Sequence, residues 1–317
     1  MDASIFVIGH KKPDNDSIVS AVAYAYLKNE LNKRAREEGK PGGEIIYKPA
    51  CLGPLPAESA WVLEQNGFEA PELIQRVEAG QKIVLVDHNE SQQAVDGFED
   101  ADLVEIVDHH RIGSITTNNP IQFINLPWGS TATIVTVLFR MLQVSISKEL
   151  AGVLLSAILT DTVITKSPTT TDVDREQIAY LSGIAGVDAT EYGLRIFECR
   201  GGEDDMDIET LVCADSKEFK VGDATVLIAQ RETVNLKGVM KREDEMRAHM
   251  RSLIETNGYE FALLLVTDII AEGSQFLVEG DPTTVERVFG ITCAPGGTWM
   301  PGVLSRKKQV AAPILGA

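Results

Sequence analysis

Histidine and aspartate recur together in three short motifs, and their side chains are the best suited to chemistry in this chain. The motifs are GHKKPDNDS at 9–17, VDHNE at 86–90 and VDHHRIG at 107–113. They contain His10, His88, His109 and His110, four of the five histidines. Buried aspartate and histidine are costly unless they are paired or bound to metal. Three such motifs therefore predict one convergent metal site.

The elements that must position these motifs have an α/β pattern. Short apolar runs predict strands at 4–9, 45–50, 82–87 and 103–108, and near-continuous runs of this kind suit parallel strands buried on both faces. Helical spacing predicts helices at 18–32 (capped by Ser17), 58–67, 130–142 and 148–161. Open parallel sheets bind ligands beyond the carboxyl ends of their strands. Gly9, Asp87 and Asp108 should therefore meet at one edge, and Asp161 joins them from the end of a helix.

Four carboxylates in one pocket would require strong charge compensation. The candidates are Asp14, Asp16, Asp87 and Asp161. Each pair at about 5 Å repels by roughly 3 kcal/mol at an effective dielectric of about 20. Two divalent ions balance the four charges, and two ions can share a bridging water and hold it for in-line attack on phosphorus. The pattern favours hydrolysis of a phosphoester or phosphoanhydride.

The ligand types indicate which ions fit. Oxygen and imidazole ligands without thiolate suit manganese, iron, cobalt or zinc better than calcium, and the histidines argue against magnesium alone. Adjacent side chains rarely face the same ligand, so one of His109 and His110 should bind metal and the other substrate. His88 is a candidate for orienting a ligand, and His249 is expected to be solvated.

The composition of the chain limits the kinds of molecule that it is expected to bind. The net charge of -18 argues against long polyanions such as nucleic acid, while a small anion would need a local positive patch or metal ions. The segment SRKKQV at 305–310 offers such a patch, and if it is a regular strand, Arg306 and Lys308 share one face and Lys307 the other. The four scattered cysteines predict free thiols. The N-terminus lacks the basic start and long apolar run of a signal peptide, and no later stretch is apolar for long enough to suggest a membrane span. We therefore expect a cytoplasmic protein without a membrane segment.

A second, smaller α/β unit is expected beyond residue 200. Glycine and acidic residues interrupt the apolar pattern in ECRGGEDDMD, which indicates a linker. After it, the pattern predicts strands at 217–221, 224–233 and 261–270 and an amphipathic helix at 241–258.

Taken in order along the chain, GHKKPDNDS, VDHNE, VDHHRIG and SRKKQV closely resemble the family II inorganic pyrophosphatases, the manganese-dependent branch of the DHH phosphoesterase superfamily. The resemblance implies a DHH domain with a mainly parallel sheet at 1–197, a hinge linker at 198–204 and a smaller DHHA2 domain with a mixed sheet at 205–317. It also implies hydrolysis of inorganic pyrophosphate between the two domains, and a homodimer formed through the N-terminal domain.

Roles for individual residues also follow from the resemblance. It assigns one metal ion to His10, Asp14 and Asp87, and the other to Asp16, Asp87, His109 and Asp161, with Asp87 bridging. His110, Lys217, Arg306 and Lys307 would hold the pyrophosphate, and Asp87 would act with them in catalysis. Placing Arg306 and Lys307 together implies a bent or looped backbone there. The expected cofactors are two Mn²⁺ ions per subunit, with Co²⁺ as a substitute, and Mg²⁺ bound with the substrate.

Two other functions compete with this one. A DHH-type phosphodiesterase acting on short oligonucleotides or cyclic dinucleotides would share the N-terminal motifs but would carry a GGGH-like motif, and the nearest string here, GGTW at 296–299, has no histidine. A non-catalytic binding protein would be expected to have lost a ligand, and every expected ligand is present. The short spacing after VDHHRIG leaves no room for a nucleotide-sensing insert, so we predict no nucleotide regulation.

Overall fold

The chain divides into two compact units, each described here by itself. The computed structural model describes residues 4–41, 44–200 and 206–316. Unit 1 is Met1–Arg200 and unit 2 is Gly201–Ala317. Of the expected hinge, residues 198–200 form the last turn of a helix, and residues 201–204 lie outside the described residues.

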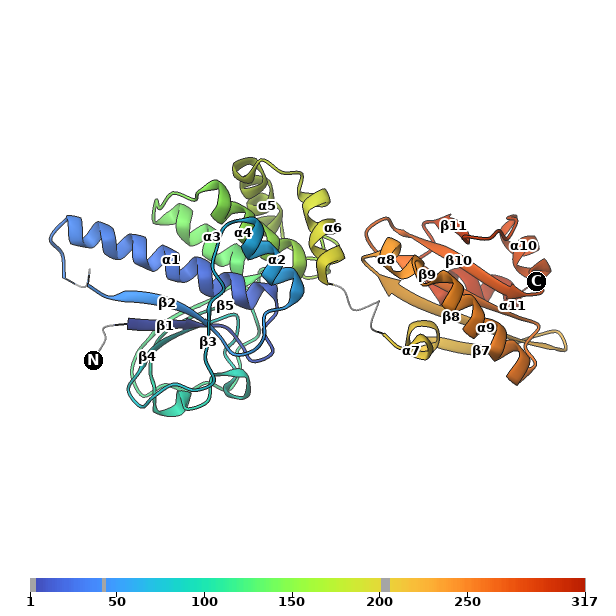
Figure 1. The fold of residues 1–317 in the computed structure, drawn as a ribbon, viewed down its shortest axis with the longest axis horizontal. Coiled ribbons are helices and arrows are strands. Elements are labelled where there is room, and N and C mark those ends of the chain that lie inside the picture. The colour runs from blue at the N-terminus through green and yellow to red at the C-terminus, as the bar shows by residue number, and fades with distance from the viewer. Residues whose placement is uncertain (1–3, 42–43, 201–205, 317) are drawn as a thin grey trace. The chain divides into compact units, whose positions relative to one another are not determined.

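Unit 1 is a parallel sheet with helices, as the sequence predicted (Figure 1). Its strands are β1 (Ser4–Ile8), β2 (Ile46–Cys51), β3 (Glu72–Leu73), β4 (Lys82–Val86), β5 (Asp102–Asp108) and β6 (Gln122–Asn125). Its helices are α1 (Asn15–Glu37), α2 (Ala57–Gln65), α3 (Thr131–Met141), α4 (Lys148–Asp161), α5 (Asp172–Ala185) and α6 (Ala189–Arg200), with short 3₁₀ helices at Ser91–Gln93 and Phe98–Asp100.

The strand order of this sheet places a ligand site beside β1. The order is β3-β2-β1-β4-β5-β6, and every pairing is parallel. The chain leaves β1 toward β2 on one side and later returns to β4 on the other, so β1 and β4 flank the point where the order reverses. In open α/β sheets, ligands bind in the crevice beyond the carboxyl ends of the strands at this point. The first two histidine motifs follow β1 and β4.

The sheet is buried on both faces, which explains its near-continuous apolar strands. Helices α1, α3 and α4 pack together on one face, where α1 crosses β2. On the other face, Ile8, Ile83, Leu85 and Ile106 form an apolar cluster with Val95 and Phe98 of the segment that follows β4. The ends of the strands are thus held between two packed layers.

The first long helix begins earlier than its predicted start. Helix α1 starts at Asn15, and its N-cap is Asp14, whose carboxylate accepts a hydrogen bond from the Ser17 backbone N–H at 2.9 Å. The predicted cap, Ser17, lies inside the helix. Its hydroxyl instead accepts a hydrogen bond from the His10 backbone N–H. Both contacts fix the loop that carries the first motif.

Unit 2 is a mixed sheet with helices on both faces, in agreement with the predicted fold class. Its strands are β7 (Ser216–Val221), β8 (Ala224–Thr233), β9 (Phe261–Asp268), β10 (Gly273–Gly280) and β11 (Thr298–Pro301), in the order β11-β10-β9-β8-β7. Its helices are α7 (Ile208–Cys213), α8 (Leu236–Met240), α9 (Glu243–Asn257), α10 (Thr283–Phe289) and α11 (Ala312–Leu315). Only β8 and β9 pair in parallel; the other pairs are antiparallel.

The basic segment near the C-terminus is a helical turn and not the regular strand that was one of the conformations considered for SRKKQV. Residues Arg306–Ala311 form a π-helical turn that continues into α11. Ser305 caps this turn by accepting a hydrogen bond from the Lys308 backbone N–H. Val310 and Ala311 anchor the turn in the core of unit 2, while Lys307 and Lys308 are exposed.

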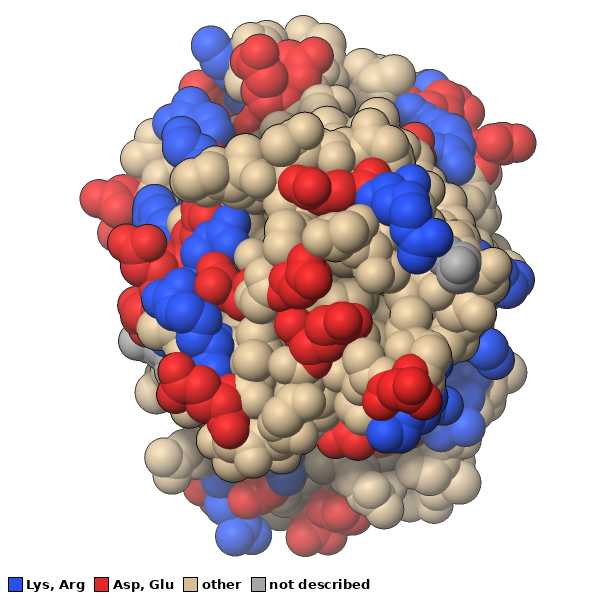
Figure 2. Space-filling model, turned by 90° about the vertical axis from the view of Figure 1, so that its right-hand side faces the viewer, with Lys and Arg blue, Asp and Glu red and all other residues tan. Residues whose placement is uncertain are grey.

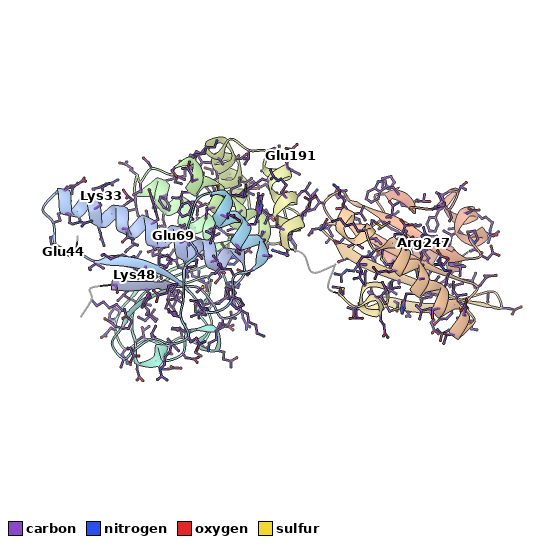
Figure 3. All side chains as sticks on the ribbon, in the orientation of Figure 1. Lys33, Glu44, Lys48, Glu69, Glu191 and Arg247 are labelled. Carbon is purple, nitrogen blue, oxygen red and sulfur yellow. The ribbon has the colours of Figure 1, made fainter. Side chains whose placement is uncertain are left out.

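The surface charges of the chain are interleaved on the face that Figure 2 shows, where lysine and arginine side chains lie beside aspartate and glutamate. Arg247 of α9, labelled in Figure 3, illustrates such pairing, because it bridges Glu243 on its own helix and Glu279 on β10 at 2.7 and 2.9 Å. Across the described ranges, no helix is both long enough and apolar enough to span a bilayer.

Candidate metal centre

The six predicted metal ligands meet beyond the carboxyl ends of β1, β4 and β5. His10 follows β1, Asp14 and Asp16 lie at the start of α1, Asp87 follows β4, His109 follows β5, and Asp161 is the last residue of α4. Their side-chain atoms include two close groups, His10 with Asp14 and Asp87, and Asp16 with His109 and Asp161, and a third close group joins Asp87, His109 and His110. The first two groups correspond to the ligand sets that the resemblance implies, except that Asp87 is absent from the second.

Asp87 lies between the two groups. Its Oδ2 is 3.4 Å from His10 Nε2, and its Oδ1 is 3.5 Å from His109 Nε2. His10 Nε2 is 3.5 Å from Asp14 Oδ2, and His109 Nε2 is 3.6 Å from Asp161 Oδ2. Two ligand atoms that are each about 2.1 Å from one ion lie roughly 3 to 3.5 Å apart. The spacing therefore fits an ion in each group, with one oxygen of Asp87 directed toward each.

The histidines are oriented as metal ligands. His10 Nδ1 lies 2.8 Å from the Lys11 carbonyl oxygen and His109 Nδ1 lies 2.9 Å from the Trp128 carbonyl oxygen. A carbonyl accepts only a proton-bearing nitrogen, so a neutral ring presents a bare Nε2 lone pair. His109 Nε2 is buried and has no hydrogen-bond partner among the described residues. With carboxylate oxygens of Asp87 and Asp161 nearby, such an unpaired acceptor suits a bound cation.

Asp87 has an unusual backbone that directs its side chain. Its φ is +63°, in the left-handed region, where aspartate is tolerated better than most residues. This conformation ends β4 and turns the chain at the sheet edge. The side chain is 1% exposed, and its Oδ1 accepts a hydrogen bond from the Thr131 hydroxyl at 2.9 Å.

Asp16 is held by the first turn of α3. Its carboxylate accepts hydrogen bonds from the Ser130 hydroxyl and from the backbone N–H groups of Thr131 and Ala132, at 2.9, 2.6 and 3.0 Å. A helix N-terminus stabilises negative charge because its N–H groups and dipole point outward. Sequence reasoning missed these partners, although a Ser-Thr pair opening an apolar helix was a visible cue.

The electrostatics of the metal-free cluster show why positive charge is needed there. Burial and the charge of Asp16 raise the pKa of Asp87 well above its usual range, and the same two causes raise the pKa of Asp161. Burial lowers the pKa of His10, but its hydrogen bonds to Asp14 and Asp87 outweigh burial and raise it to about 11. Without metal, protons therefore take over part of the charge compensation.

His110 lies close to Asp87 and His109 and is hydrogen-bonded to a second aspartate. Its Nδ1 is 2.9 Å from Asp108 Oδ1 and 3.8 Å from Asp87 Oδ1. The hydrogen bond to Asp108 raises the pKa of His110 to about 9, against the effect of burial. Asp108 is fully buried and also accepts hydrogen bonds from the side-chain amide of Asn89 and the backbone N–H of His109. Asp108 and Asn89 were not predicted as site residues.

The two remaining histidines belong to none of the close ligand groups, although His88 Nε2, like His109 Nε2, is buried and has no hydrogen-bond partner among the described residues. His88 is buried, its Nδ1 lies 2.9 Å from the Val86 carbonyl oxygen, and its ring meets that of His10 edge to face at 6.3 Å between centroids. Burial lowers the pKa of His88 to about 4, so the ring is neutral. His249 lies in unit 2, half-buried, with Nε2 3.8 Å from the Cys213 sulfur. All four cysteines are free.

Two of the three predicted substrate-binding cations of unit 2, Lys217 and Arg306, lie beside Ile228. Lys217 of β7 is the cross-strand partner of Ile228, and Arg306 Nη1 donates to the Ile228 carbonyl oxygen at 3.2 Å. Arg306 also forms an ion pair with Asp215 at 2.7 Å. The helical turn places Lys307 directly after Arg306, on the exposed side.

The two halves of the chain match two known domain families. Residues 4–158 match the model of the DHH family N-terminal domain, and residues 195–317 match that of the DHHA2 domain. The fold and the site thus define a DHH–DHHA2 protein. A likeness of 14% identity and TM-score 0.52 to the crystal structure of an exopolyphosphatase-related protein from Bacteroides fragilis, over 99% of this chain and 92% of that one, shows the same fold.

Full-length relatives place the chain more narrowly. It is 42% identical to the probable manganese-dependent inorganic pyrophosphatase of Archaeoglobus fulgidus, over 99% of this chain and 98% of that one. It is 36% identical to the manganese-dependent inorganic pyrophosphatase of Methanothrix thermoacetophila, over 99% and 98%. A crystal structure of a Methanococcus jannaschii protein assigned to the family II inorganic pyrophosphatases matches at 34% identity and TM-score 0.59, over 98% of each chain. The chain belongs to the family of manganese-dependent, family II inorganic pyrophosphatases.

Proposed function

We propose that this protein hydrolyses inorganic pyrophosphate to two phosphates at a dinuclear manganese centre. The observation that carries the proposal is the double role open to Asp87, whose two carboxylate oxygens face two separate groups of ligand atoms 3.4 and 3.5 Å away. Full-length similarity to proteins named manganese-dependent inorganic pyrophosphatases supports the substrate.

The metal ligands follow from the two groups. His10, Asp14 and Asp87 hold one ion, and Asp16, Asp87, His109 and Asp161 hold the other. Manganese suits this mixture of imidazole and carboxylate, and cobalt suits it as a substitute. Two ions bound there would supply positive charge and would lower the pKa of the attacking water.

The chain's own cations bind the substrate. His110, whose pKa is raised by Asp108, is protonated at neutral pH and donates to a phosphate oxygen. Lys217, Arg306 and Lys307 of unit 2 bind the remaining oxygens and stabilise the charge that develops on the departing phosphate. Mg²⁺ accompanies the pyrophosphate, and its charge reduces repulsion between the tetra-anion and an acidic protein.

Closure of the DHHA2 domain onto the DHH domain is part of this proposal. It would bring the three cations of unit 2 to a pyrophosphate bound in unit 1 and exclude water other than the nucleophile. The domain limits of 1–197 and 205–317 and the hinge at 198–204 belong to the same proposal, as do a homodimer through the N-terminal domain and a cytoplasmic location.

A substrate comparison tests the proposal. The protein, purified without added metal and then supplied with Mn²⁺, is assayed for phosphate release from pyrophosphate, beside a dinucleotide and a cyclic dinucleotide. We expect rapid release from pyrophosphate alone. Cleavage of the dinucleotides without hydrolysis of pyrophosphate would instead establish a DHH-type phosphodiesterase.

A further inference from the structure

A short backbone segment contacts three of the six proposed ligands without being a ligand itself. Residues 128–133 comprise the end of the loop between β6 and α3 and the first turn of α3, and we call them the orienting segment. The Trp128 carbonyl oxygen accepts from His109 Nδ1, and Ser130, Thr131 and Ala132 donate to Asp16. The Thr131 hydroxyl also donates to Asp87. A displacement of this segment would therefore change the aim of ligands in both groups.

The orienting segment is in turn held by one buried carboxylate, that of Asp174 in α5. The Gly129 backbone N–H donates to Asp174 Oδ1 and Oδ2 at 3.0 and 2.9 Å, and the Thr133 hydroxyl donates to Oδ1 at 2.6 Å. Gly129 and Thr133 thus lie on either side of residues 130–132, which contact Asp16 and Asp87. A Cβ at Gly129 would come within 2.8 Å of Asp174 Oδ2, so the close approach requires glycine.

The Asp174 carboxylate is itself held in place by hydrogen bonds from Thr171. The backbone N–H and the hydroxyl of Thr171 both donate to Oδ2 at 2.7 Å. The capping box of α5 consists of the bond from the Thr171 N–H to this carboxylate and the bond from the Asp174 backbone N–H to the Thr171 hydroxyl oxygen. Asp174 is 0% exposed, and it has no ion-pair partner in the part of the chain that the structure describes. Every hydrogen bond to this carboxylate comes from a donor group. A carboxylate can accept such bonds on both of its oxygens, whereas an amide accepts on one oxygen and its NH₂ group donates.

We propose that Asp174 is a positioning residue for the metal centre, acting through the orienting segment on Asp16, Asp87 and His109. The inference rests on the proposed function only in taking these three residues as ligands. Groups that orient metal ligands typically contribute about 10- to 100-fold to metal affinity or activity. A cap with a purely structural role would contribute to stability and leave metal affinity unchanged.

The test is Asp174→Asn, which keeps the size of the side chain but turns an amide NH₂ toward one set of donors. Binding of Mn²⁺ to the full chain is measured by the loss of the electron paramagnetic resonance signal of free Mn²⁺, without substrate. We expect an affinity about 10- to 100-fold below that of the wild type. Wild-type affinity in a folded Asp174→Asn protein would overturn the inference.

Glu105→Gln is the matched control for lost stability. Glu105 is another buried carboxylate of unit 1, and it accepts hydrogen bonds from Tyr24 and Lys28, both at 2.6 Å. This variant should unfold at a lower temperature yet bind Mn²⁺ as the wild type does. An equal fall in Mn²⁺ affinity in both variants would mean that general destabilisation weakens the site, and would refute a specific role for Asp174.

A milder pair of variants decides the question if Asp174→Asn does not fold. Thr133→Val removes one donor to Asp174, whereas Thr136→Val removes a hydroxyl whose hydrogen bond, among the described residues, goes to the Ala132 carbonyl oxygen on the same helix. We expect Thr133→Val to weaken Mn²⁺ binding by up to about tenfold and Thr136→Val to leave it unchanged. Equal affinities would overturn the inference.

These measurements do not depend on turnover, so the two proposals fail separately. Weakened Mn²⁺ binding in Asp174→Asn supports the positioning role whichever phosphate compound the wild type hydrolyses. Wild-type hydrolysis of pyrophosphate together with unchanged Mn²⁺ affinity in the variants would leave the proposed function standing and remove the positioning role.

Discussion

The two units hold their functional side chains in opposite ways. In unit 1, Asp16 and Asp87 are almost fully buried, and backbone N–H groups and hydroxyls fix their oxygens. In unit 2, Lys217 and Lys307 are exposed, and the Lys217 ammonium lies over the Phe219 ring. Arg306 is held by Asp215 and the Ile228 carbonyl oxygen. A metal site needs ligands fixed to within a fraction of an ångström before the ion arrives. Cations that bind a substrate arriving from solvent can reorganise around it.

This contrast predicts that substitutions in unit 1 remove the metal, while those in unit 2 affect only the substrate. The largest effect should come from Asp87. Asp87→Ala should abolish both Mn²⁺ retention and phosphate release, because both groups lose a ligand. In the wild type, Mn²⁺ at 100 times its dissociation constant should stabilise the protein by about 2.7 kcal/mol. A thermal scan with and without Mn²⁺ should show this shift for the wild type and none for the variant.

Two further variants serve as controls for Asp87→Ala. Alanine is strained at φ +63°, whereas asparagine tolerates this region, so Asp87→Asn separates backbone strain from the loss of charge. Asp96→Asn removes an exposed carboxylate of the same unit that pairs with Lys11, and it should retain metal and activity. An Asp87→Ala protein that kept both would refute the bridging role.

A smaller effect is expected in unit 2, where two neighbouring lysines provide a matched pair. Lys307→Ala should lower kcat by about 10²-fold, as does loss of one donor that stabilises charge in a transition state, and it should leave Mn²⁺ affinity unchanged. Lys308→Ala removes the same charge one residue later and should stay within about twofold of the wild type. Steady-state kinetics and a Mn²⁺ titration of both variants measure this. Equal losses would show that the basic segment acts only through its overall charge.

Much of unit 1 could be predicted from the sequence because its cues are local. The helix from Lys148 to Asp161 was predicted with both ends correct, and the strands before the three motifs were predicted to within a few residues. Given a parallel sheet, the convergence of the motifs follows from the strand ends. The start of α1 was misplaced because Asp14, Asn15, Asp16 and Ser17 can all cap a helix, and only the structure shows which one does.

What could not be predicted depends on contacts between distant residues. Asp174 lies 45 positions from Gly129, and the string TTTDVD around it looks like an ordinary loop leading into a helix cap. The conformation of the basic segment could not be predicted for a different reason. A run of consecutive charged residues has no apolar periodicity, so the sequence Arg306, Lys307, Lys308 does not indicate whether the segment is a strand or a helical turn. The buried Val310, which decides between these conformations, lies at the end of the segment.

The smallest predicted effect concerns a group of unit 2 that lies outside the proposed ligand groups. The Tyr259 hydroxyl, 8% exposed as a residue, donates to Glu218 at 2.5 Å, and burial together with this bond raises its pKa to about 12. Because the folded pKa lies above the unfolded value of about 10, the contribution to stability is complete below pH 10 and is lost as the pH rises through 12. Urea unfolding at several pH values should therefore show unit 2 weakening across this window.

Tyr259→Phe should remove this pH dependence, because phenylalanine has no proton to lose. Trp299 is the tryptophan of unit 2, and with Trp61 and Trp128 of unit 1 replaced by phenylalanine its fluorescence follows unit 2 within the full chain. Mn²⁺ should shift the unfolding of unit 1 and leave this titration unchanged. If Mn²⁺ moved the Trp299 transition as well, the two units would unfold together, and the contrast between a metal-dependent unit and a metal-independent one would not hold.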